Sequence, residues 1–345
     1  IKYAFEVLGL RRLENGYFKD NVPNDFFEVL ALYTAESQIS HLPWALTFGE
    51  EEIRIGFENL KIILDDYDNL IMLENDEIIL MEYGVVEFDE NGIITSIYDK
   101  LNERESLDGR GNILTISLDK CVHETAWNLE LNYQKKMWEL KADKIEVIES
   151  NAVRGVIRVT YTFNKSTITQ DVILYQNGES VVFDTTVDWH ESDKVLKAGF
   201  DVSVIDTDAT YDIAHGATKR PTHWNTLYDL TRFEVAAHKW ADLSEGGYGC
   251  SIINDCKYGY DIHNSHMRIT LMRAPTCPDR TGDHGINTFK YAFHPHAEDW
   301  RYDTVQQAIA FNVPLVAVYN AEANEGVIDG EKKFILDLED NVAID

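Results

Sequence analysis

Most of this 345-residue chain alternates apolar and polar residues with a period of two, and short turn sequences interrupt the alternation. Residues 85–89 form one such run, Glu90-Asn91-Gly92 supplies Asn-Gly turn chemistry, and residues 93–98 form a returning run. Two alternating runs joined by such a turn predict a β-hairpin. Because a period of two places alternate side chains on opposite faces of a strand, the pattern favours half-buried antiparallel strands over helices.

Longer runs of the same kind predict a meander of antiparallel strands at residues 153–163, 166–175 and 180–189. They are rich in β-branched and aromatic residues, and Gln176-Asn177-Gly178 turns the second run into the third. Later runs at 249–253, 266–272, 287–293 and 313–319 extend the strand content. Helical patterns are confined to residues 24–38 and 303–311. The expected fold class is therefore all-β, with one large antiparallel sandwich.

The length and a local shift in composition divide the chain into three parts. Roughly 100–200 residues per domain allows two domains, and acidic residues concentrate in residues 50–77, where interleaved apolar residues indicate solvated strand faces rather than a cation site. We predict a small β-rich domain with a possible helical insertion at 1–70, a β-sandwich at 71–320 and the start of a further, truncated β segment at 321–345. The chain begins with Ile1 and ends in mid-pattern, so we interpret it as a piece of a longer protein.

Charge and cysteine content exclude several classes of partner. Lys and Arg total 31 against 60 Asp and Glu, a net charge of −29, which repels nucleic acid phosphates and anionic lipid headgroups. No apolar run approaches the roughly 18 residues of a membrane span. Four scattered cysteines favour a reduced, cytoplasmic setting. Cys250 and Cys256 could be bridged across a hairpin, and the alternative is two half-buried thiols.

Common catalytic motifs are missing from the sequence: it has no G-x-S-x-G, no Walker loop, no dinucleotide fingerprint and no H-E-x-x-H. The nearest approach to a metal-ligand cluster is His284 beside Asp283, together with His294-Pro295-His296. An H-x-H spacing places both imidazoles on one strand face, but we expect Pro295 to mark a strand end or a bulge, so the spacing does not predict the directions of the two rings. We therefore predict no metal ligands in this chain.

The densest unusual stretch runs from residue 220 to 260 and is rich in Arg, His, Asn, Trp and Tyr. These are the residue types of a sugar site, because polar side chains reach pairs of hydroxyls while aromatic rings stack on the apolar face of a pyranose. The same residues permit a structural reading, in which Arg232 pairs with Glu234 and Trp240 staples two sheets together. Residue types alone do not separate the two.

The same stretch resembles the β region of class II α-mannosidases, glycoside hydrolase family 38. The resemblance rests on R-P-T-H-x-N-T, R-F-E-V-x-A-H-K-W-A-D-L-S-E, N-D-C-K-Y-G-Y-D and Y-A-F-H-P-H-A-E-D-W, which begin at residues 220, 232, 254 and 291. It extends from roughly residue 72 onward. Asn128, Trp224 and Leu227-Tyr228 depart from the family pattern, which bears on individual substrate contacts and not on the fold.

The resemblance implies a galactose-mutarotase-like supersandwich that packs on an N-terminal catalytic domain. It also implies hydrolysis of terminal α-mannosides with retention, by an Asp nucleophile that also ligates Zn²⁺ and by a second carboxylate that acts as acid and base. Because the chain has no H-x-D-x-x-W motif, we expect it to lack the nucleophile, the zinc and any other cofactor. The candidate residues at the rim of the substrate pocket, whose ligand is a mannose-containing oligosaccharide or glycan, are Arg220 and His223, with Asn225, His238 and Trp240 behind them.

Two other functions stay open at this point. A stand-alone carbohydrate-binding module predicts that the chain binds mannosides by itself. A mutarotase-like epimerase predicts acid and base catalysis by a His and a carboxylate that converge in one concave site.

Overall fold

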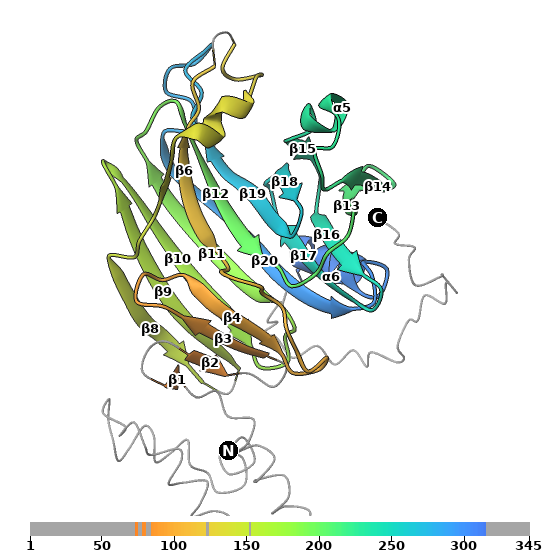
Figure 1. The fold of residues 1–345 in the computed structure, drawn as a ribbon. Helices are drawn as coiled ribbons and strands as arrows, with labels where there is room; N and C mark the ends of the chain where they lie inside the picture. The colour runs from red at the N-terminus through yellow and green to blue at the C-terminus, as the bar shows by residue number, and fades with distance from the viewer. Residues whose placement is uncertain (1–72, 75–77, 81–83, 122–123, 152, 315–345) are drawn as a thin grey trace, which may run out of the picture.

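The computed structural model describes residues 73–74, 78–80, 84–121, 124–151 and 153–314 (Figure 1). The predicted domain at 1–70, the helix within it and the segment at 321–345 lie outside these residues, as does nearly all of the strand expected at 313–319. In the described part every pair of neighbouring strands is antiparallel, so the predicted all-β class is confirmed.

Three antiparallel sheets make up the fold. The largest has nine strands, in the order β14 (Gly216–Pro221), β13 (Asp208–Ile213), β16 (Trp240–Glu245), β17 (Tyr248–Asn254), β20 (Gly285–Ala297), β11 (Val181–Trp189), β10 (Ser166–Tyr175), β9 (Arg154–Phe163) and β8 (Lys144–Ser150). The second has six: β15 (Val235–Ala236), β18 (Gly259–His263), β19 (His266–Arg273), β12 (Lys194–Asp201), β6 (Ile113–Leu118) and β7 (Met137–Glu139).

The third sheet has five short strands: β1 (Leu73–Glu74), β2 (Ile78–Leu80), β3 (Gly84–Phe88), β4 (Ile94–Asp99) and β5 (Arg104–Glu105). The helices of the described residues are equally short: the 3-10 helix η1 (Leu131–Lys135), α5 (Leu227–Leu230) and α6 (Thr304–Asn312). Figure 1 shows the six-stranded sheet lying across one face of the curved nine-stranded sheet, with β3 and β4 in front of β8–β10.

The local patterns predicted the hairpins correctly. β3 and β4 pair across the predicted turn, and β9, β10 and β11 form the predicted meander. Gly92, in the first turn, has φ +76°, and a Cβ there would lie 2.7 Å from Cγ1 of Val159 in β9. A glycine is therefore required both by the turn and by its contact with the neighbouring sheet.

The core lies between the nine-stranded and six-stranded sheets and is centred on aromatic side chains. Phe200 of β12 stacks on Phe293 of β20, with ring centroids 4.8 Å apart, and contacts Phe183 of β11 at 5.8 Å. Phe183 in turn stacks on Tyr291 at 4.7 Å. All four are buried. Because the rings come from facing sheets, their burial holds the two layers together.

Helix α6 packs on the other face of the nine-stranded sheet, which confirms the helix predicted at 303–311. It buries Trp240 and Ile253, and Trp240 stacks on Trp300 just before the helix, with centroids 5.1 Å apart. The expectation that Trp240 staples two sheets together was therefore wrong. Alternation along β16 turns Trp240 away from the sandwich interior and toward α6.

Pro295 also differs from expectation, because β20 continues through it to Ala297 without ending there. Pro295 pairs with Cys250 of β17, whereas the ladder to β11 ends at Phe293. The proline ring therefore sits where one side of β20 needs no N–H donor, the position in which a strand tolerates proline. The described residues include no helix long and apolar enough to cross a membrane.

Candidate functional site: the polar face of the six-stranded sheet

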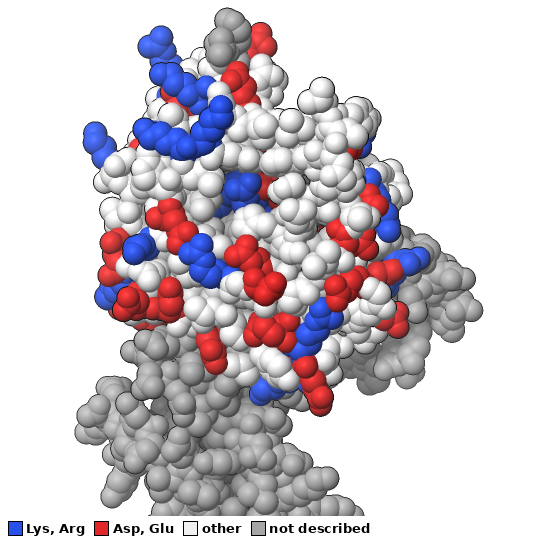
Figure 2. Space-filling model, in the orientation of Figure 1, with Lys and Arg blue, Asp and Glu red and all other residues white. Residues whose placement is uncertain are grey.

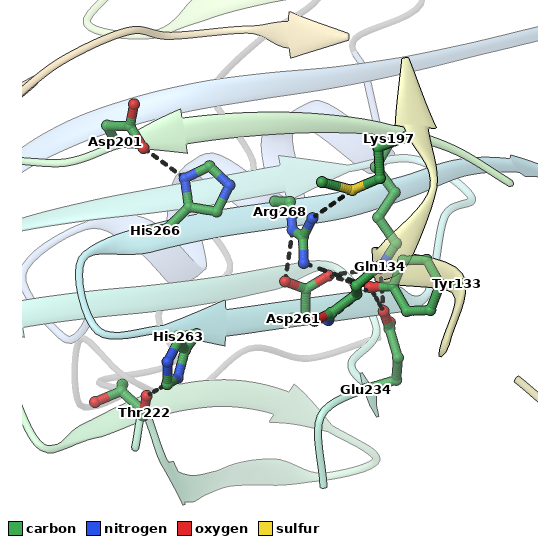
Figure 3. Close-up of polar contacts among 11 residues, drawn as sticks. Tyr133, Gln134, Lys197, Asp201, Thr222, Glu234, Asp261, His263, His266 and Arg268 are labelled. Carbon is green, nitrogen blue, oxygen red and sulfur yellow. Dashed lines mark hydrogen bonds and ion pairs between the residues drawn. The ribbon is translucent and has the colours of Figure 1, made fainter. Parts of the chain in front are cut away.

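The face of the six-stranded sheet that is turned away from the core carries a group of polar side chains, which we call the polar face (Figure 3). It consists of Tyr133, Lys197, Asp201, Glu234, Asp261, His263, His266 and Arg268. Strand register brings them together, since Asp261 lies opposite Arg268 and Asp201 lies opposite His266. Side chains between them along β18, such as Tyr260 and Ile262, point into the core.

Buried charges form the centre of the polar face. The Lys197 side chain is 1% exposed, and its Nζ contacts Oε1 of Glu234 and lies 2.5 Å from Oδ2 of Asp261. Arg268 donates from Nε to Oδ1 of Asp261 at 2.7 Å. The hydroxyl of Tyr133 in η1 donates to Oε1 of Glu234 at 2.6 Å. Two cations thus face two carboxylates, and the cluster ties η1 and the loop before β15 to the sheet.

Burial and charge pull the pKa values in opposite directions within this cluster. Burial disfavours the Lys197 ammonium, but Asp261 and Glu234 outweigh it and raise the pKa of Lys197. Burial likewise disfavours the Asp261 carboxylate, yet Lys197 and Arg268 lower its pKa. Burial raises the pKa of Glu234 to about 7 against the opposing pull of Lys197. Glu234 is therefore the member of the cluster whose protonation changes near neutral pH.

A second pair on the polar face joins His266 to Asp201, with Nδ1 2.6 Å from Oδ1 and both side chains about a third exposed. Gly199 lies in β12 two residues before Asp201 and opposite Arg268, and a Cβ there would lie 3.1 Å from Cε1 of His266 and 3.2 Å from Cγ of Arg268. The missing side chain leaves room for both residues. The pair provides a His and a carboxylate, although their direct bond means that they do not flank an open space between them.

Arg220, the first predicted rim residue, lies at the end of β14. Its guanidinium lies 4.8 Å above the ring of Tyr211 and donates from Nη1 to the carbonyl of Ala236 at 3.0 Å. Arg220 is half-buried and makes no ion pair with any residue that the structure describes. A half-buried guanidinium without a carboxylate retains N–H donors for a ligand or a neighbouring domain.

His223 and Asn225 follow Arg220 in the segment that leads to α5. The backbone N–H of Asn225 donates to Nδ1 of His223 at 3.4 Å, and that nitrogen lies 3.7 Å from Asp229. Between them, Trp224 stacks on His263 of the polar face, with ring centroids 4.0 Å apart. This stacking joins the segment of the predicted rim to the polar face.

His238 and Trp240 occupy different surroundings. His238 is exposed, and the centroid of its ring lies 6.1 Å from that of Tyr258 in an edge-on arrangement. Its backbone N–H donates to the carbonyl of Asp212 at 3.1 Å. Trp240 is buried under α6 on the outer face of the other sheet. The structure therefore groups Arg220, His223 and Asn225 near the polar face, leaves His238 at its edge and separates Trp240 from them.

Motif reasoning did not single out Lys197, Asp261, Arg268 or Tyr133. The predicted pair between Arg232 and Glu234 was also wrong, because Glu234 binds Lys197, and Arg232 lies over Tyr228 instead. One signal was present: Lys197 interrupts the apolar run of β12, whose residues from Val195 to Phe200 are all buried. A lysine at such a position indicates a buried charge that requires carboxylate partners.

The metal-ligand candidates lie elsewhere. His284 lies just before the long strand β20 and contacts Ser192 and Glu191, whereas His294 and His296 lie near its other end. In the described part, potential ligand atoms of Glu179, His294 and Asp303 lie within 4.8 Å of one another. Both ring nitrogens of His294 are hydrogen-bonded, one to Ser180 and one to Asp303 of the same group.

Figure 2 shows the same side of the molecule as a surface. A small group of charged atoms over the middle of the six-stranded sheet is surrounded by largely uncharged surface that extends toward α5, whereas charges crowd the region over β3 and β4. Exposed apolar side chains on this side include Met137, Leu227 and Tyr228. For a chain with a net charge of −29, such a surface is suited to contact with another protein surface.

Comparison with known proteins places these residues in a family. Residues 81–281 match the model described as the C-terminal domain of glycosyl hydrolases family 38. The chain is 35% identical over 249 residues to alpha-mannosidase G of Dictyostelium discoideum, which covers 70% of this chain and 22% of that protein. It is 36% identical over 262 residues to an alpha-mannosidase of Saccharomyces cerevisiae, and this match covers 71% of this chain and 24% of the yeast protein.

A solved structure shares the fold. An alpha-mannosidase from Enterococcus faecalis V583 superposes with a TM-score of 0.62 at 16% identity, which covers 71% of this chain and 32% of that one. The chain thus spans about a quarter of the length of the curated relatives it matches.

Proposed function

Because this chain belongs to glycosyl hydrolase family 38 and contains that family's C-terminal domain, we propose that it is the β-sandwich part of an α-mannosidase. In this proposal the complete protein hydrolyses terminal α-mannosides of an oligosaccharide or glycan with retention, and this chain supports the catalytic domain. The observation that carries the proposal is the family match over residues 81–281 together with named α-mannosidase relatives about three times as long as this chain.

The polar face is the proposed contact surface with the catalytic domain. Its charges are balanced internally, and the surrounding surface is largely uncharged (Figure 2). Docking therefore buries little uncompensated charge, which removes the main cost of desolvating such a face. The free thiols of Cys121, Cys250, Cys256 and Cys277 are consistent with a reducing, cytoplasmic location.

The proposed rim residues are Arg220, His223 and Asn225, with His238 at the edge. Arg220 has N–H donors to spare and no carboxylate partner among the described residues, so it can bind the hydroxyls of a sugar or hold a carboxylate of the catalytic domain. The nucleophile, the acid/base carboxylate and the Zn²⁺ that grips sugar hydroxyls are assigned to the catalytic domain.

The proposal is tested by release of nitrophenol from para-nitrophenyl α-mannoside. The chain alone is expected to be inactive with or without added Zn²⁺, and the same chain joined to a family catalytic domain is expected to be active in a zinc-dependent manner. Turnover by the chain alone would overturn the proposal, because a catalytic site would then lie within the sandwich.

The rim is tested by Arg220→Ala in the joined enzyme. Loss of one charged hydrogen-bond donor at the pocket is expected to lower kcat/KM about tenfold without changing the melting temperature. Arg154→Ala, in β9 near the opposite edge of the same nine-stranded sheet, is the matched control and should leave kcat/KM unchanged. Equal kinetics for the two variants would remove Arg220 from the rim.

A further inference from the structure

A second polar site lies on the outer face of the nine-stranded sheet, where β14, β13 and β16 meet the turn before α6. A cavity of about 450 Å³ opens there, and its lining includes Asp208 and Thr210 of β13, Lys219 of β14, Asp242 of β16 and Trp300. This volume lies within the range of sites for small organic ligands. Because neighbouring residues point to opposite faces of a strand, Lys219 lines this cavity while Arg220 faces the other way, toward β15.

The floor of the cavity is fixed by a buried network. Asp242 is 1% exposed, and its Oδ2 accepts from Nε2 of His296 at 2.8 Å and from Ser251 at 3.0 Å. Its Oδ1 accepts from the hydroxyl of Ser244 at 2.5 Å. The other ring nitrogen of His296 donates to the carbonyl of Ala297 at 3.0 Å. With every partner in place, the Asp242 carboxylate is held in one orientation at the bottom of the cavity.

Three of the five acidic residues in the lining are neutralised: Asp242 pairs with His296, Glu245 with Arg104, and Asp299 with Arg301. The other two, Asp206 and Asp208, make no ion pair among the described residues, and the lining adds the cation Lys219. This leaves less negative charge than the set of carboxylates around a typical Ca²⁺ ion.

The remaining polar groups of the lining include both hydrogen-bond donors and hydrogen-bond acceptors. Lys219 has no ion-pair partner among the residues described, and the carboxylate of Asp208 accepts only a long bond, 3.4 Å, from the neighbouring Thr207. The Thr210 hydroxyl lies between them on the same face, since Thr210 is opposite Lys219 in the ladder. Donors, acceptors and a hydroxyl thus converge on one volume.

Trp300 supplies an apolar wall beside these groups. It is half-buried and is held in place by stacking on Trp240. An aromatic ring next to converging donors and acceptors matches a pyranose, which has an apolar C–H face and a rim of hydroxyls.

We propose that this cavity binds a neutral pyranoside of one or two sugar rings, as a glycan site separate from the polar face. The choice of mannose as the sugar rests on the proposed function, whereas the site itself rests on the cavity and its lining. The cavity lies on the opposite side of the sandwich from the polar face, so a sugar bound there does not compete with the proposed contact with the catalytic domain.

The test is an NMR titration of the full chain with methyl α-mannopyranoside and with a mannobiose. A dissociation constant of about 1 mM is expected for the monosaccharide, from the usual binding energy per ligand atom. Lys219→Met and Asp208→Asn are each expected to weaken binding at least about fivefold. Lys239→Met, an exposed lysine just before β16 that does not line the cavity, is the matched control and should bind normally.

Three outcomes would overturn the proposal. The first is no binding of either sugar at concentrations well above the expected dissociation constant, and the second is binding that is unchanged in Lys219→Met and Asp208→Asn. The third is binding of Ca²⁺ at this site in preference to sugar. Because binding is measured on the chain without a catalytic domain, its failure is distinct from failure of the hydrolysis assay.

Discussion

Two clusters of buried charge lie on the outer faces of the two main sheets, and they are built differently. On the polar face, Lys197 and Arg268 neutralise Asp261 and Glu234. On the outer face of the nine-stranded sheet, the single carboxylate Asp242 is held by His296 and by serine hydroxyls. The first cluster uses cations that stay protonated throughout the physiological range, whereas the second uses a side chain that can lose its proton.

The difference teaches what each cluster can do. Removal of one cation from the polar face leaves Asp261, and Glu234 when it is ionised, buried with too little charge to balance them, so that cluster depends on both cations to clamp η1 and the loop before β15 to the sheet. Loss of the proton from His296 leaves Asp242 with its hydroxyl partners, so the second cluster tolerates a change of state. The following substitutions test this contrast, from the largest expected effect to the smallest.

Lys197→Met should be the most damaging substitution. It leaves the carboxylates of Asp261 and Glu234 buried without their ammonium, which is expected to lower the free energy of unfolding by about 3–5 kcal/mol. Urea denaturation of the full chain measures this loss. Lys239→Met, the exposed control, should change stability by less than about 0.5 kcal/mol. A loss below about 1 kcal/mol for Lys197→Met would mean that the cluster is not a clamp.

Gly249→Ala should disturb the second cluster through packing. A Cβ at this position would overlap the imidazole of His296 and lie 2.5 Å from Oγ of Ser244. We expect a loss of about 1–3 kcal/mol, because the histidine must move away from Asp242. Gly246→Ala, in the adjoining turn where a Cβ meets nothing within 4 Å, is the control. Similar losses in both variants would point to backbone effects and away from His296.

The pH dependence of stability should distinguish His296 from the cations of the polar face, Lys197 and Arg268. Burial disfavours a charged His296, but its hydrogen bond to Asp242 and the charge of that carboxylate outweigh burial and raise its pKa above 6.5. The stabilisation from this pair is therefore fully present below pH 6.5 and is lost as pH rises through the folded pKa.

The loss is expected to be on the order of 1 kcal/mol, the size of one charged hydrogen bond. Denaturation midpoints between about pH 5 and 9 measure it, and the slope should be reduced in His296→Gln but retained in the exposed control Lys239→Met. A slope that is the same in His296→Gln and in the unchanged chain would show that His296 does not titrate in this range.

Arg110→Met should have the smallest effect and sets the scale for the others. Its ion pair with Glu139 has an N–O distance of 2.6 Å, like the buried pairs, but both side chains are more than a third exposed. Solvent screening is expected to reduce its contribution to less than about 0.5 kcal/mol. A loss comparable to that of Lys197→Met would mean that distance and not burial decides the strength of these pairs.

Local patterns in the sequence predicted the elements that depend on neighbouring residues. The hairpin of β3 and β4, the meander of β9 to β11 and the helix α6 all follow from short-range periodicity and turn chemistry. Pro295 was misread for the same reason, because a local rule marks a strand end at proline. Whether proline is tolerated depends on which neighbouring strand needs its N–H, and that is set by the sheet.

The candidate site was only partly readable. The residue types around Arg220 and His223 indicated a sugar-binding surface and, through their spacing, the family. The buried charges of the polar face were not readable, because Lys197 lies 37 positions from Glu234 and 64 positions from Asp261 in the sequence. Trp240 shows the same limit, since no local feature indicates which face of the sheet α6 covers.

By itself, then, the sequence determined the all-β class, the strands with the clearest alternation, such as β3, β4 and β9 to β11, and the family to which the chain belongs, because these depend on periodicity and on motifs within short segments. The tertiary structure decided which charges are buried together, that Trp240 faces α6 and that Lys219 and Arg220 serve opposite faces. Those features arise from strand register and sheet packing, which bring together residues far apart in the chain and which no local pattern encodes.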